Sequence, residues 1–415
     1  MCDLTVVGLG YIGLPTAALF AGGGLTVHGV DVNPHAIATI NEGRAHIVEP
    51  GLDELVQQVV QAGTFVASAE YGDSSAYIVA VPTPFADGKK PDLRFVQQAA
   101  EAIAPGLASG ALVVLESTSP IGATEQLASW LADARPDLRI AQPGMESPDV
   151  HVAYCPERVL PGNILYELVH NDRLVGGLTK HCAEKAAELY GQVVKGDCRL
   201  TTARTAEMAK LTENAFRDVN IAFANELSLI ADEVDVDVWE LIELANLHPR
   251  VNILQPGAGV GGHCIAVDPW FLVDASENAH LIECARNVND GKPGWVVNQI
   301  LDAAADLEAP TIACLGLSYK PDIDDLRESP AIEVVRQLHA AVPHTVLVVE
   351  PNVDTLPSEL DGLEIELCSL EDAVRRADVL VGLVAHKEIV ELASTLAGSR
   401  ILIDPAGIFA NGQNL

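Results

Sequence analysis

A cysteine that follows a glycine-rich run is the best candidate nucleophile in this chain. The segment GAGVGGHCIAVDP places four glycines before Cys264, and Asp268 follows four residues later. Glycine lets a backbone approach a ligand closely, and a helical continuation would put Cys264 and Asp268 on one face. Most cysteines are inert small hydrophobes, but this glycine approach favours a reactive thiol, because nearby N–H groups and a cation stabilise a thiolate.

Cationic and amide side chains that could assist such a thiol occur in the middle of the sequence. Lys210 and Asn214 are four residues apart, and Arg217 follows. On a helix they would face the same way. Such side chains are usually solvated, but this segment is largely apolar with few other cations, so we predict a directed role. An ammonium and an amide beside a thiol could stabilise an oxyanion.

The chain begins with the pattern of a dinucleotide-binding turn. Leu4–Val7 predicts a buried strand, GLGYIG follows at once, and a helix and a second strand ending at Asp31 come next. Gly8 would make the tight turn, Gly10 would admit a pyrophosphate, and Gly13 would let helix and strand pack closely. The helix N-terminus would bind phosphates. Asp31 would bind a ribose 2′-hydroxyl and repel a 2′-phosphate, which favours NAD over NADP.

Hydroxyl side chains follow two further predicted strands, 76–81 and 111–115. Thr83, Ser117 and Thr118 stand at the carboxyl ends of these strands, where parallel sheets bind ligands. We expect them to face the cofactor, while capping of the next helix is a comparable alternative for each residue.

A nicotinamide site, a nucleophilic thiol and an oxyanion site can together oxidise an alcohol twice. The alcohol would become an aldehyde, the thiol would bind it, and a thioester would then be hydrolysed to a carboxylate. The hydrolytic water needs a base, and Glu157 and Asp268 are both candidates. For Glu157, a helix-capping or ion-pair role is about equally plausible.

One long helix, from about residue 201 to 234, is predicted to connect two α/β regions. Apolar residues recur there at helical spacing, at Met208, Leu211, Ala215, Val219, Ala222, Leu227 and Ile230. A helix of this length would serve as a spine and a dimer surface. The last third repeats the first in outline, with strands at 311–317 and 345–349 around a helix at 329–340. Ser318 and Pro321 replace the second and third glycines, so this repeat lacks the pyrophosphate turn.

The composition excludes several classes of partner. The formal net charge is −33, from 58 acidic and 25 basic residues, which argues against nucleic acid and anionic membranes as partners. We expect no membrane span, because we find no uncharged apolar stretch of about 18 residues. The eight cysteines are scattered without a Cys-x-x-Cys pair. This is typical of a reducing cytoplasm and not of a disulfide or zinc framework, so we predict no metal.

The chain resembles the nucleotide-sugar 6-dehydrogenases of the UDP-glucose/GDP-mannose dehydrogenase family over nearly its whole length. The resemblance rests on GLGYIGLP, VPTP, ESTSPIGAT, YCPERVLPGN, AEMAKLTENAFRDVNIAFANE, GVGGHCIAVDPW and LSYKPDIDDLRESP. The run HPRVNILQPGAGVGGHCIAVDPWF is most similar to members that oxidise UDP-N-acetyl-D-mannosamine. Val267 stands where glucose-type members carry a lysine, which weakens the alternative substrate UDP-glucose. UDP-N-acetyl-D-glucosamine is a further alternative.

The resemblance extends to individual positions. The predicted catalytic set is Cys264, Lys210, Asn214, Asp268, Glu157 and Thr118. The predicted cofactor contacts are Gly8, Gly10, Tyr11, Ile12, Gly13, Asp31, Thr83, Thr124 and Arg327. The predicted nucleotide-sugar contacts are Arg158, Val159, Lys210, Asn214, Arg217, His248, Arg250, Gly261, Tyr319 and Lys320.

We therefore expect an α/β fold of two Rossmann-like doubly wound domains joined by a long central helix. Residues 1–200 would bind NAD, 201–300 would form a helical dimerisation region, and 301–415 would bind the UDP-sugar. The implied reaction is a four-electron oxidation at C6 for surface polysaccharide synthesis. His248 and Arg250 would reach the neighbouring subunit of a homodimer. A two-electron hydroxyacid dehydrogenase or a non-catalytic sensor would not need Cys264.

Overall fold

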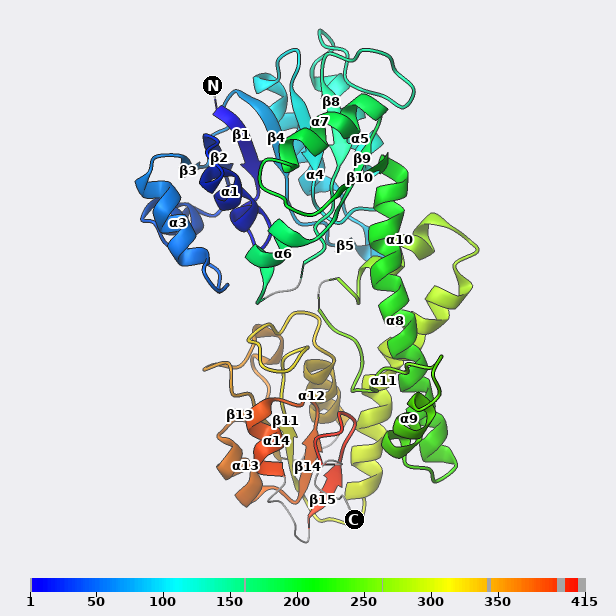
Figure 1. Cartoon of the computed structure of the whole chain (residues 1–415). Helices are drawn as coiled ribbons and strands as arrows, with labels where there is room; N and C mark the ends of the chain where they lie inside the picture. Colours follow the sequence, from blue (N-terminus) through cyan, green and yellow to red (C-terminus); the bar gives the residue numbers. More distant parts are fainter. Residues whose placement is uncertain (1, 160–161, 263, 342–344, 394–399, 410–415) are drawn as a thin grey trace. The chain divides into compact units, whose positions relative to one another are not determined.

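The chain divides into two compact units, Met1–Glu213 and Asn214–Leu415. The computed structural model describes residues 2–159, 162–262, 264–341, 345–393 and 400–409 (Figure 1). In both units the central strands are short runs of buried, largely aliphatic residues, which is the composition of strands covered by helices on both faces. This burial pattern makes each unit a helix–sheet–helix sandwich.

The first unit is built on an eight-stranded sheet in the order β10-β9-β8-β7-β4-β1-β2-β3. Neighbouring strands are parallel except β8 and β9. The strand order reverses beside β1, which is where an open sheet of this kind binds its ligand. The strands are β1 (Cys2–Val7), β2 (Val27–Val30), β3 (Phe65–Ser68), β4 (Ser74–Val79), β7 (Leu112–Leu115), β8 (His151–Tyr154), β9 (Arg173–Gly177) and β10 (Cys198–Thr202), with a small hairpin of β5 (Phe85–Ala86) and β6 (Lys90–Pro91).

Helices cover both faces of this sheet. Helices α1, α3 and α7 bury one apolar face, and α4, α5 and the start of α8 bury the other. The helices are α1 (Gly13–Gly22), α2 (Pro34–Asn41), α3 (Leu52–Gln61), α4 (Arg94–Ile103), α5 (Ala123–Ala134), α6 (Ile164–His170) and α7 (Lys180–Tyr190). The predicted strand–turn–helix–strand at the start of the chain is confirmed. Strand β4 ends at Val79, two residues before the predicted end, because the chain leaves the sheet at Ala80 to pack against the turn at Gly8.

Helix α8 (Ala203–Glu233) is the long helix that the apolar spacing predicts. Its buried positions include Leu211, Ala215 and Ala222, as expected from that spacing. Met208 and Ile230, which belong to the same predicted pattern, are instead about half exposed, at 53% and 48%. The division between the two units falls within this helix.

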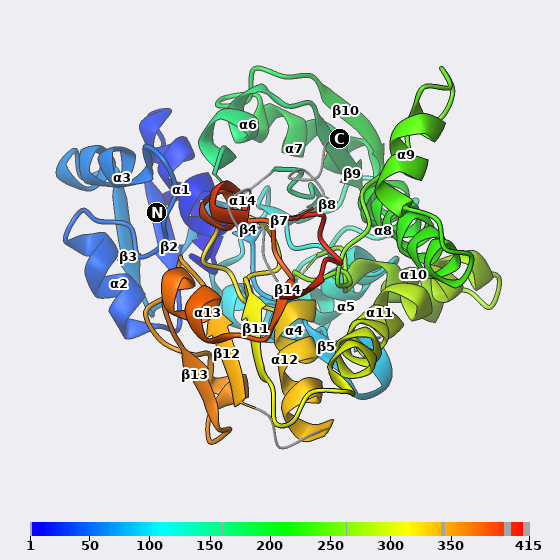
Figure 2. The ribbon, with the colours of Figure 1, turned by 90° about the horizontal axis from the view of Figure 1, so that it is seen from below.

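The second unit contains a five-stranded parallel sheet in the order β13-β12-β11-β14-β15. Helices α11 and α12 pack on one face and α13 and α14 on the other (Figure 2). The strands are β11 (Thr311–Leu315), β12 (Thr345–Val349), β13 (Ile365–Leu367), β14 (Val379–Gly382) and β15 (Ile401–Ile403). The helices are α9 (Val238–Asn246), α10 (Asp268–Ala275), α11 (His280–Ala304), α12 (Pro330–Ala341), α13 (Leu370–Arg376) and α14 (Lys387–Ala393).

The central strands of the two sheets are arranged in the same way: β1 lies between β2 and β4, and β11 lies between β12 and β14. The predicted fold of two Rossmann-like domains with a long central helix is therefore confirmed. Within the described residues, no helix is both long and apolar enough to cross a membrane.

Candidate active site

The glycine turn after β1 has three different requirements at its three glycines. Gly8 has φ of +88°, and a Cβ there would lie 2.5 Å from the carbonyl oxygen of Ala80. A Cβ on Gly13 would lie 1.8 Å from the carbonyl oxygen of Gly8. At Gly10, by contrast, no described atom lies within 4 Å of where a Cβ would be. The fold itself demands the first and third glycines, while the second borders open space.

The surroundings of this turn fit the phosphate and ribose groups of a dinucleotide. Among the described residues, no side chain caps the N-terminus of α1, and the first turn carries no acid. Its N–H groups are therefore available to a pyrophosphate. Asp31 follows β2, and its carboxylate accepts hydrogen bonds from Leu9 N (2.7 Å) and Asn33 N (2.8 Å). These bonds fix the carboxylate beside the glycine turn, where a ribose hydroxyl can donate to it.

The hydroxyl side chains after β4 and β7 join two loops to each other. Thr83 Oγ1 donates to the carbonyl oxygen of Thr118 (2.5 Å), and Ser117 Oγ donates to that of Val81 (2.6 Å). The hydroxyls of Thr83 and Ser117 thus donate to backbone carbonyls of the neighbouring loop. Thr83 and Thr118 lie together at the carboxyl edge of the sheet, as predicted.

Thr124, a predicted cofactor contact, is fully buried on α5. Its backbone N–H and its hydroxyl both donate to Glu207 Oε1, at 2.8 and 2.6 Å. The other carboxylate oxygen of Glu207 accepts from Gly122 N at 2.7 Å. Glu207 could not be recognised from the sequence, because a single acid on a long helix gives no local sign that it is buried.

Lys210 and Glu157 form a buried ion pair, with Nζ 3.2 Å from Oε1. Lys210 is 5% exposed and Glu157 is 8% exposed. The second oxygen of Glu157 accepts from Val159 N at 2.9 Å. The ion-pair alternative for Glu157 is therefore the arrangement in this structure, and the pairing holds the Lys210 ammonium at a fixed point.

Arg158 lies next to this pair and is also engaged. Its Nη2 is 2.7 Å from Glu213 Oε1, and its Nη1 donates to the carbonyl oxygen of Asp172. Because both Arg158 and Glu213 remain partly exposed, the guanidinium is held without being sealed from solvent. Leu160 and Pro161 of the YCPERVLPGN block lie outside the described residues.

The second unit brings Cys264, Asp268 and Asn214 together. The segment 264–267 is a turn that leads directly into α10, and Asp268 N donates to the carbonyl oxygen of Cys264 at 2.8 Å. Asp268 is 2% exposed, and Asn214 Nδ2 donates to its Oδ2 at 2.5 Å. Cys264 is half-buried. The predicted spacing of one helical turn between the thiol and the acid is thus present; His263 lies outside the described residues.

The glycines before Cys264 allow close packing of protein on protein. A Cβ on Gly261 would lie 2.7 Å from Tyr319 Cβ, and Gly262 N donates to the carbonyl oxygen of Arg327 at 3.1 Å. From the sequence alone, these glycines are expected to let the backbone approach a ligand. In the structure, the 317–330 segment packs so closely on Gly261 and Gly262 that neither position has room for a side chain. Gly261 lies against Tyr319, which is another predicted substrate contact.

The turn after β11 is held by a buried cluster around Glu350 and His386, which the sequence alone does not reveal. Glu350 follows β12 at the position that matches Asp31, and it accepts from Leu317 N (2.7 Å), Ser318 N (2.9 Å) and His386 Nε2 (3.0 Å). Burial alone would raise the pKa of Glu350, but these donors lower it to about 2. With its oxygens occupied in this way, Glu350 is a poor acceptor for a ribose.

The remaining predicted contacts of this unit are accessible. Lys320 is exposed, and Arg327 is half-exposed with Nη2 2.6 Å from Asp325 Oδ2. Arg217 is exposed on α8, and His248 and Arg250 are exposed after the end of α9. These five side chains are therefore open to a ligand or to another subunit.

A second buried network supports the glycine segment from α8 and α11. Asn225 Oδ1 accepts from Gly257 N at 2.9 Å, and Asn225 Nδ2 donates to Asn289 Oδ1 at 2.8 Å. Arg286 Nη1 and Asn289 Nδ2 both donate to Asp218 Oδ1, at 2.6 and 2.8 Å. All four side chains are at most 1% exposed. Their burial depends on two helices far apart in sequence, so spacing alone could not reveal them.

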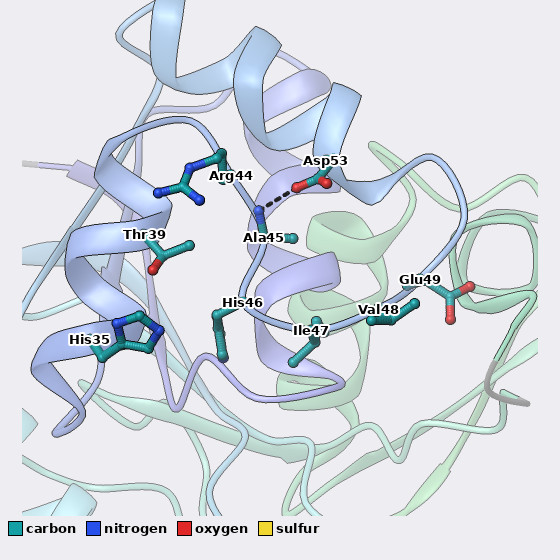
Figure 3. A pocket seen from close by; sticks show the side chains of 9 residues that line it. All are labelled: His35, Thr39, Arg44, Ala45, His46, Ile47, Val48, Glu49 and Asp53. Carbon is teal, nitrogen blue, oxygen red and sulfur yellow. Dashed lines mark hydrogen bonds between the residues drawn. The ribbon is translucent and has the colours of Figure 1, made fainter. Parts of the chain in front are cut away.

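A pocket of about 370 Å³ lies between α2 and the loop that leads into α3 (Figure 3). Its lining residues are His35, Thr39, Arg44, Ala45, His46, Ile47, Val48, Glu49 and Asp53. Burial lowers the pKa of His46, and the charge of Asp31 opposes that shift, so the pocket adjoins the predicted ribose side of the turn. None of the lining residues belongs to the predicted site. Among the described residues, no group of three potential ligands could hold a metal ion.

An open dinucleotide turn on a parallel sheet is typical of an NAD-binding oxidoreductase, and the half-buried Cys264 one helical turn before the buried Asp268 fits such an enzyme. Three family models match in succession: the NAD binding domain at residues 2–194, the central domain at 204–291 and the UDP binding domain at 313–411. The chain therefore belongs to the UDP-glucose/GDP-mannose dehydrogenase family. It is accordingly an NAD-dependent nucleotide-sugar dehydrogenase with a UDP-sugar as its class of substrate.

Relatives of known name resemble the chain over almost its whole length. It is 57% identical over 408 residues to an NDP-N-acetyl-D-galactosaminuronic acid dehydrogenase of Ralstonia nicotianae, with 98% of this chain and 96% of that protein covered. It is 54% identical over 415 residues to a UDP-N-acetyl-D-mannosamine dehydrogenase of Salmonella typhi, with 98% and 99% covered. The solved UDP-D-ManNAc dehydrogenase of Pyrococcus horikoshii is 40% identical, with 98% and 96% covered and a TM-score of 0.87.

Proposed function

We propose that this enzyme oxidises UDP-N-acetyl-D-mannosamine at C6 to UDP-N-acetyl-D-mannosaminuronate, for the synthesis of a surface polysaccharide. The observation that carries the proposal is the half-buried Cys264 one helical turn before the buried Asp268, which Asn214 holds by a hydrogen bond. A nucleophilic thiol serves a covalent four-electron oxidation and has no role in a two-electron one. The similarity to relatives named for this substrate, and Val267 in place of the glucose-type lysine, support the choice of sugar.

The roles of the chain's own residues follow from their chemistry. NAD, when bound, accepts a hydride, so two NAD molecules serve each sugar in turn. Cys264 forms a C–S bond to C6 of the aldehyde, which gives a thiohemiacetal; loss of the second hydride converts this to a thioester, and the C–S bond breaks when water attacks the thioester. Lys210 gives or takes the proton on the C6 oxygen and, with Asn214, stabilises the oxyanion. Glu157 or Asp268 takes a proton from the attacking water, and Thr118 helps to hold that water.

The binding roles divide between the cofactor and the sugar nucleotide. NAD is bound by the uncapped start of α1, the open space at Gly10, and Asp31. We assign further cofactor contacts to Tyr11, Ile12, Thr83, Thr124 and Arg327. We assign the UDP-sugar to Arg158, Val159, Arg217, Gly261, Tyr319 and Lys320. Cations are needed there because the diphosphate carries negative charge on a strongly acidic protein.

We also propose three functional regions and a homodimer in the cytoplasm. Residues 1–200 bind NAD, 201–300 form the dimerisation region and carry the catalytic lysine and cysteine, and 301–415 bind the UDP-sugar. His248 and Arg250 are exposed, as a contribution to a neighbouring subunit's site would require. All eight cysteines are free thiols, which suits a reducing compartment.

UDP-N-acetyl-D-galactosamine is a second candidate substrate. The Ralstonia relative named for N-acetyl-D-galactosaminuronic acid is at least as similar to this chain as the relatives named for UDP-N-acetyl-D-mannosamine. The alternatives predicted from sequence, UDP-N-acetyl-D-glucosamine and UDP-glucose, differ at C2 in configuration or substituent. All four sugars share the C6 alcohol and therefore the same mechanism.

The deciding experiment measures NADH release with each of these four UDP-sugars. We expect two NADH per sugar consumed and the highest kcat/KM with UDP-N-acetyl-D-mannosamine. One NADH per sugar would contradict the covalent four-electron route. A higher kcat/KM with the galactosamine, glucosamine or glucose nucleotide would replace the proposed substrate and leave the mechanism standing.

A further inference from the structure

Glu207 occupies the N-terminus of a helix that is not its own. It lies on α8, is fully buried, and receives three hydrogen bonds of 2.6–2.8 Å from Gly122 and Thr124 at the start of α5. Gly122, the residue that precedes α5, has no side chain and cannot cap the helix. A carboxylate is the favoured partner of free helix N–H groups. Glu207 thus closes this helix end against any other anion.

The segment that Glu207 holds carries the predicted catalytic residue Thr118 and the predicted cofactor contact Thr124. Residues 116–124 run from the end of β7 to the start of α5. At the beginning of this segment, Ser117 Oγ and the carbonyl oxygen of Thr118 are bonded to the loop after β4. At its end, both oxygens of Glu207 hold the backbone. The segment is therefore fixed at two points, at its start by the loop after β4 and at its end by α8.

The same helix turn carries Lys210. Glu207 and Lys210 are three residues apart on α8, so they are neighbours on its surface. Lys210 is itself fixed by Glu157, which follows β8. One turn of α8 therefore contacts the loop after β7 through Glu207 and the loop after β8 through Lys210. A shift of either loop relative to α8 would change the position of Lys210 relative to Thr118.

We propose that Glu207 is a positioning residue for the reaction, which sets the 117–124 segment against the turn of α8 that carries Lys210. The proposal rests on the proposed function, since it takes Thr118 as a catalytic residue and Thr124 as a cofactor contact. Glu207 acts through these residues and touches neither the sugar nor the cofactor. Burial raises the pKa of Glu207, and the bonds from Gly122 and Thr124 oppose that shift, which is consistent with a carboxylate kept in place by its donors.

The test variant is Glu207→Gln, which keeps the side-chain shape but presents an NH₂ group to one of the backbone N–H donors. A matched control is Glu125→Gln, because Glu125 also joins α5 to α8 through its 2.6 Å surface bond to Arg204. We expect Glu207→Gln to raise the Kd for NADH, measured by fluorescence without sugar, about tenfold, as the loss of a bond to a charged group implies. The Kd for UDP should change less than twofold, and hydrogen exchange in 117–124 should accelerate. The control should leave all three unchanged.

A folded Glu207→Gln protein with the wild-type Kd for NADH would overturn the proposal. So would equal losses of NADH and UDP affinity, because these would indicate general destabilisation. If Glu207→Gln does not fold, Glu207→Asp carries the test with the same expectations, since it keeps the charge but is too short to reach both donors. Failure of the wild-type enzyme to oxidise any UDP-sugar would refute the proposed function, while the NADH and exchange measurements would still decide the role of Glu207.

Discussion

The candidate catalytic side chains are held by partners that fix their positions. Lys210 is buried against Glu157, and Asp268 is buried against Asn214. Removing one member of a buried ion pair strands the other charge, at a cost of about 3–5 kcal/mol. Both candidate bases for the hydrolytic water, Glu157 and Asp268, are therefore also structural, and their substitution would affect folding as well as chemistry.

Cys264 offers a cleaner test at the scale of one residue, because it is half-buried and outside the NAD-binding turn. We expect Cys264→Ser to abolish formation of the uronate, since a hydroxyl cannot replace the thiolate, while the Kd for NADH stays within about twofold of wild type. Product analysis by chromatography and a fluorescence titration measure the two quantities. Unchanged uronate production would refute the covalent route.

Lys320 tests the assignment of the sugar nucleotide to the second unit. It is exposed on the turn after β11, as a contact to a diphosphate requires. We expect Lys320→Ala to weaken UDP-sugar binding about tenfold, because a charge-assisted bond is lost, with little effect on NADH. Calorimetric titrations with each ligand measure this difference. Lys387→Ala, an exposed lysine on α14, is the matched control, and equal losses of both ligands in Lys320→Ala would argue against the assignment.

At the scale of elements, the turns after β1 and β11 have similar backbone geometry but different polar contacts. Gly8 and Gly316 both have positive φ, +88° and +92°, and both turns are held by an acid after the next strand. In the first turn the acid is Asp31 and the helix start is uncapped. In the second, His386 packs on Glu350 and helps to saturate it. Only the first turn keeps free groups for a dinucleotide.

The glycines of the first turn should separate folding from binding. Gly13→Ala is expected to lower the free energy of unfolding by about 3 kcal/mol, because its Cβ would collide with the carbonyl oxygen of Gly8. Gly10→Ala should leave stability nearly unchanged and weaken NADH binding, since its Cβ would enter the space assigned to the pyrophosphate. Denaturant unfolding and NADH titration measure the two effects. Tight NADH binding by Gly10→Ala would contradict the assigned position of the cofactor.

Glu350 should make the second unit sensitive to acid. Its folded-state pKa of about 2 lies below that of the unfolded chain, so its stabilisation is complete above about pH 4.3 and is lost as the pH falls towards 2. Glu350→Gln should cost about 2 kcal/mol at neutral pH and flatten this part of the stability profile. Urea unfolding followed between pH 2 and pH 6 measures the slope. An equally steep profile in the variant would show that other carboxylates cause the acid loss.

At the scale of the whole molecule, the apolar side chains left exposed on α8 predict how copies associate. Phe216, Phe223 and Ile230 recur every seven residues and are 69%, 53% and 48% exposed. Leu244 and Leu247, on and just after α9, are also exposed. Exposed apolar faces of this kind mark interaction sites, and a repeat of seven suits packing between helices. A second copy is the occupant that the proposed homodimer requires.

A charge on this face should break the dimer. We expect Phe223→Glu to shift the protein from dimer to monomer in analytical ultracentrifugation and to reduce turnover, since His248 and Arg250 would no longer reach a neighbouring site. Val66→Glu on β3, also at an exposed apolar position, should leave both properties unchanged. A fully active monomeric Phe223→Glu protein would contradict the proposed contribution of the neighbouring subunit.

Features that depend on local spacing could be predicted from the amino-acid sequence alone. Strand–turn–helix order, the long helix, the repeat in the last third and the one-turn separation of Cys264 and Asp268 all follow from periodicity and glycine placement. The reason is that these features involve residues close together in the chain, whose geometry is set by the backbone.

Which polar groups are buried together could be seen only in the folded chain. Glu207 with Thr124, Glu350 with His386, and Asn225 with Gly257 join residues 32 to 83 positions apart. Nothing near a buried acid in the sequence reveals its partner, because the partner is brought by a different element of the fold. For the same reason, the sequence does not reveal that Tyr319 packs against the glycines before Cys264.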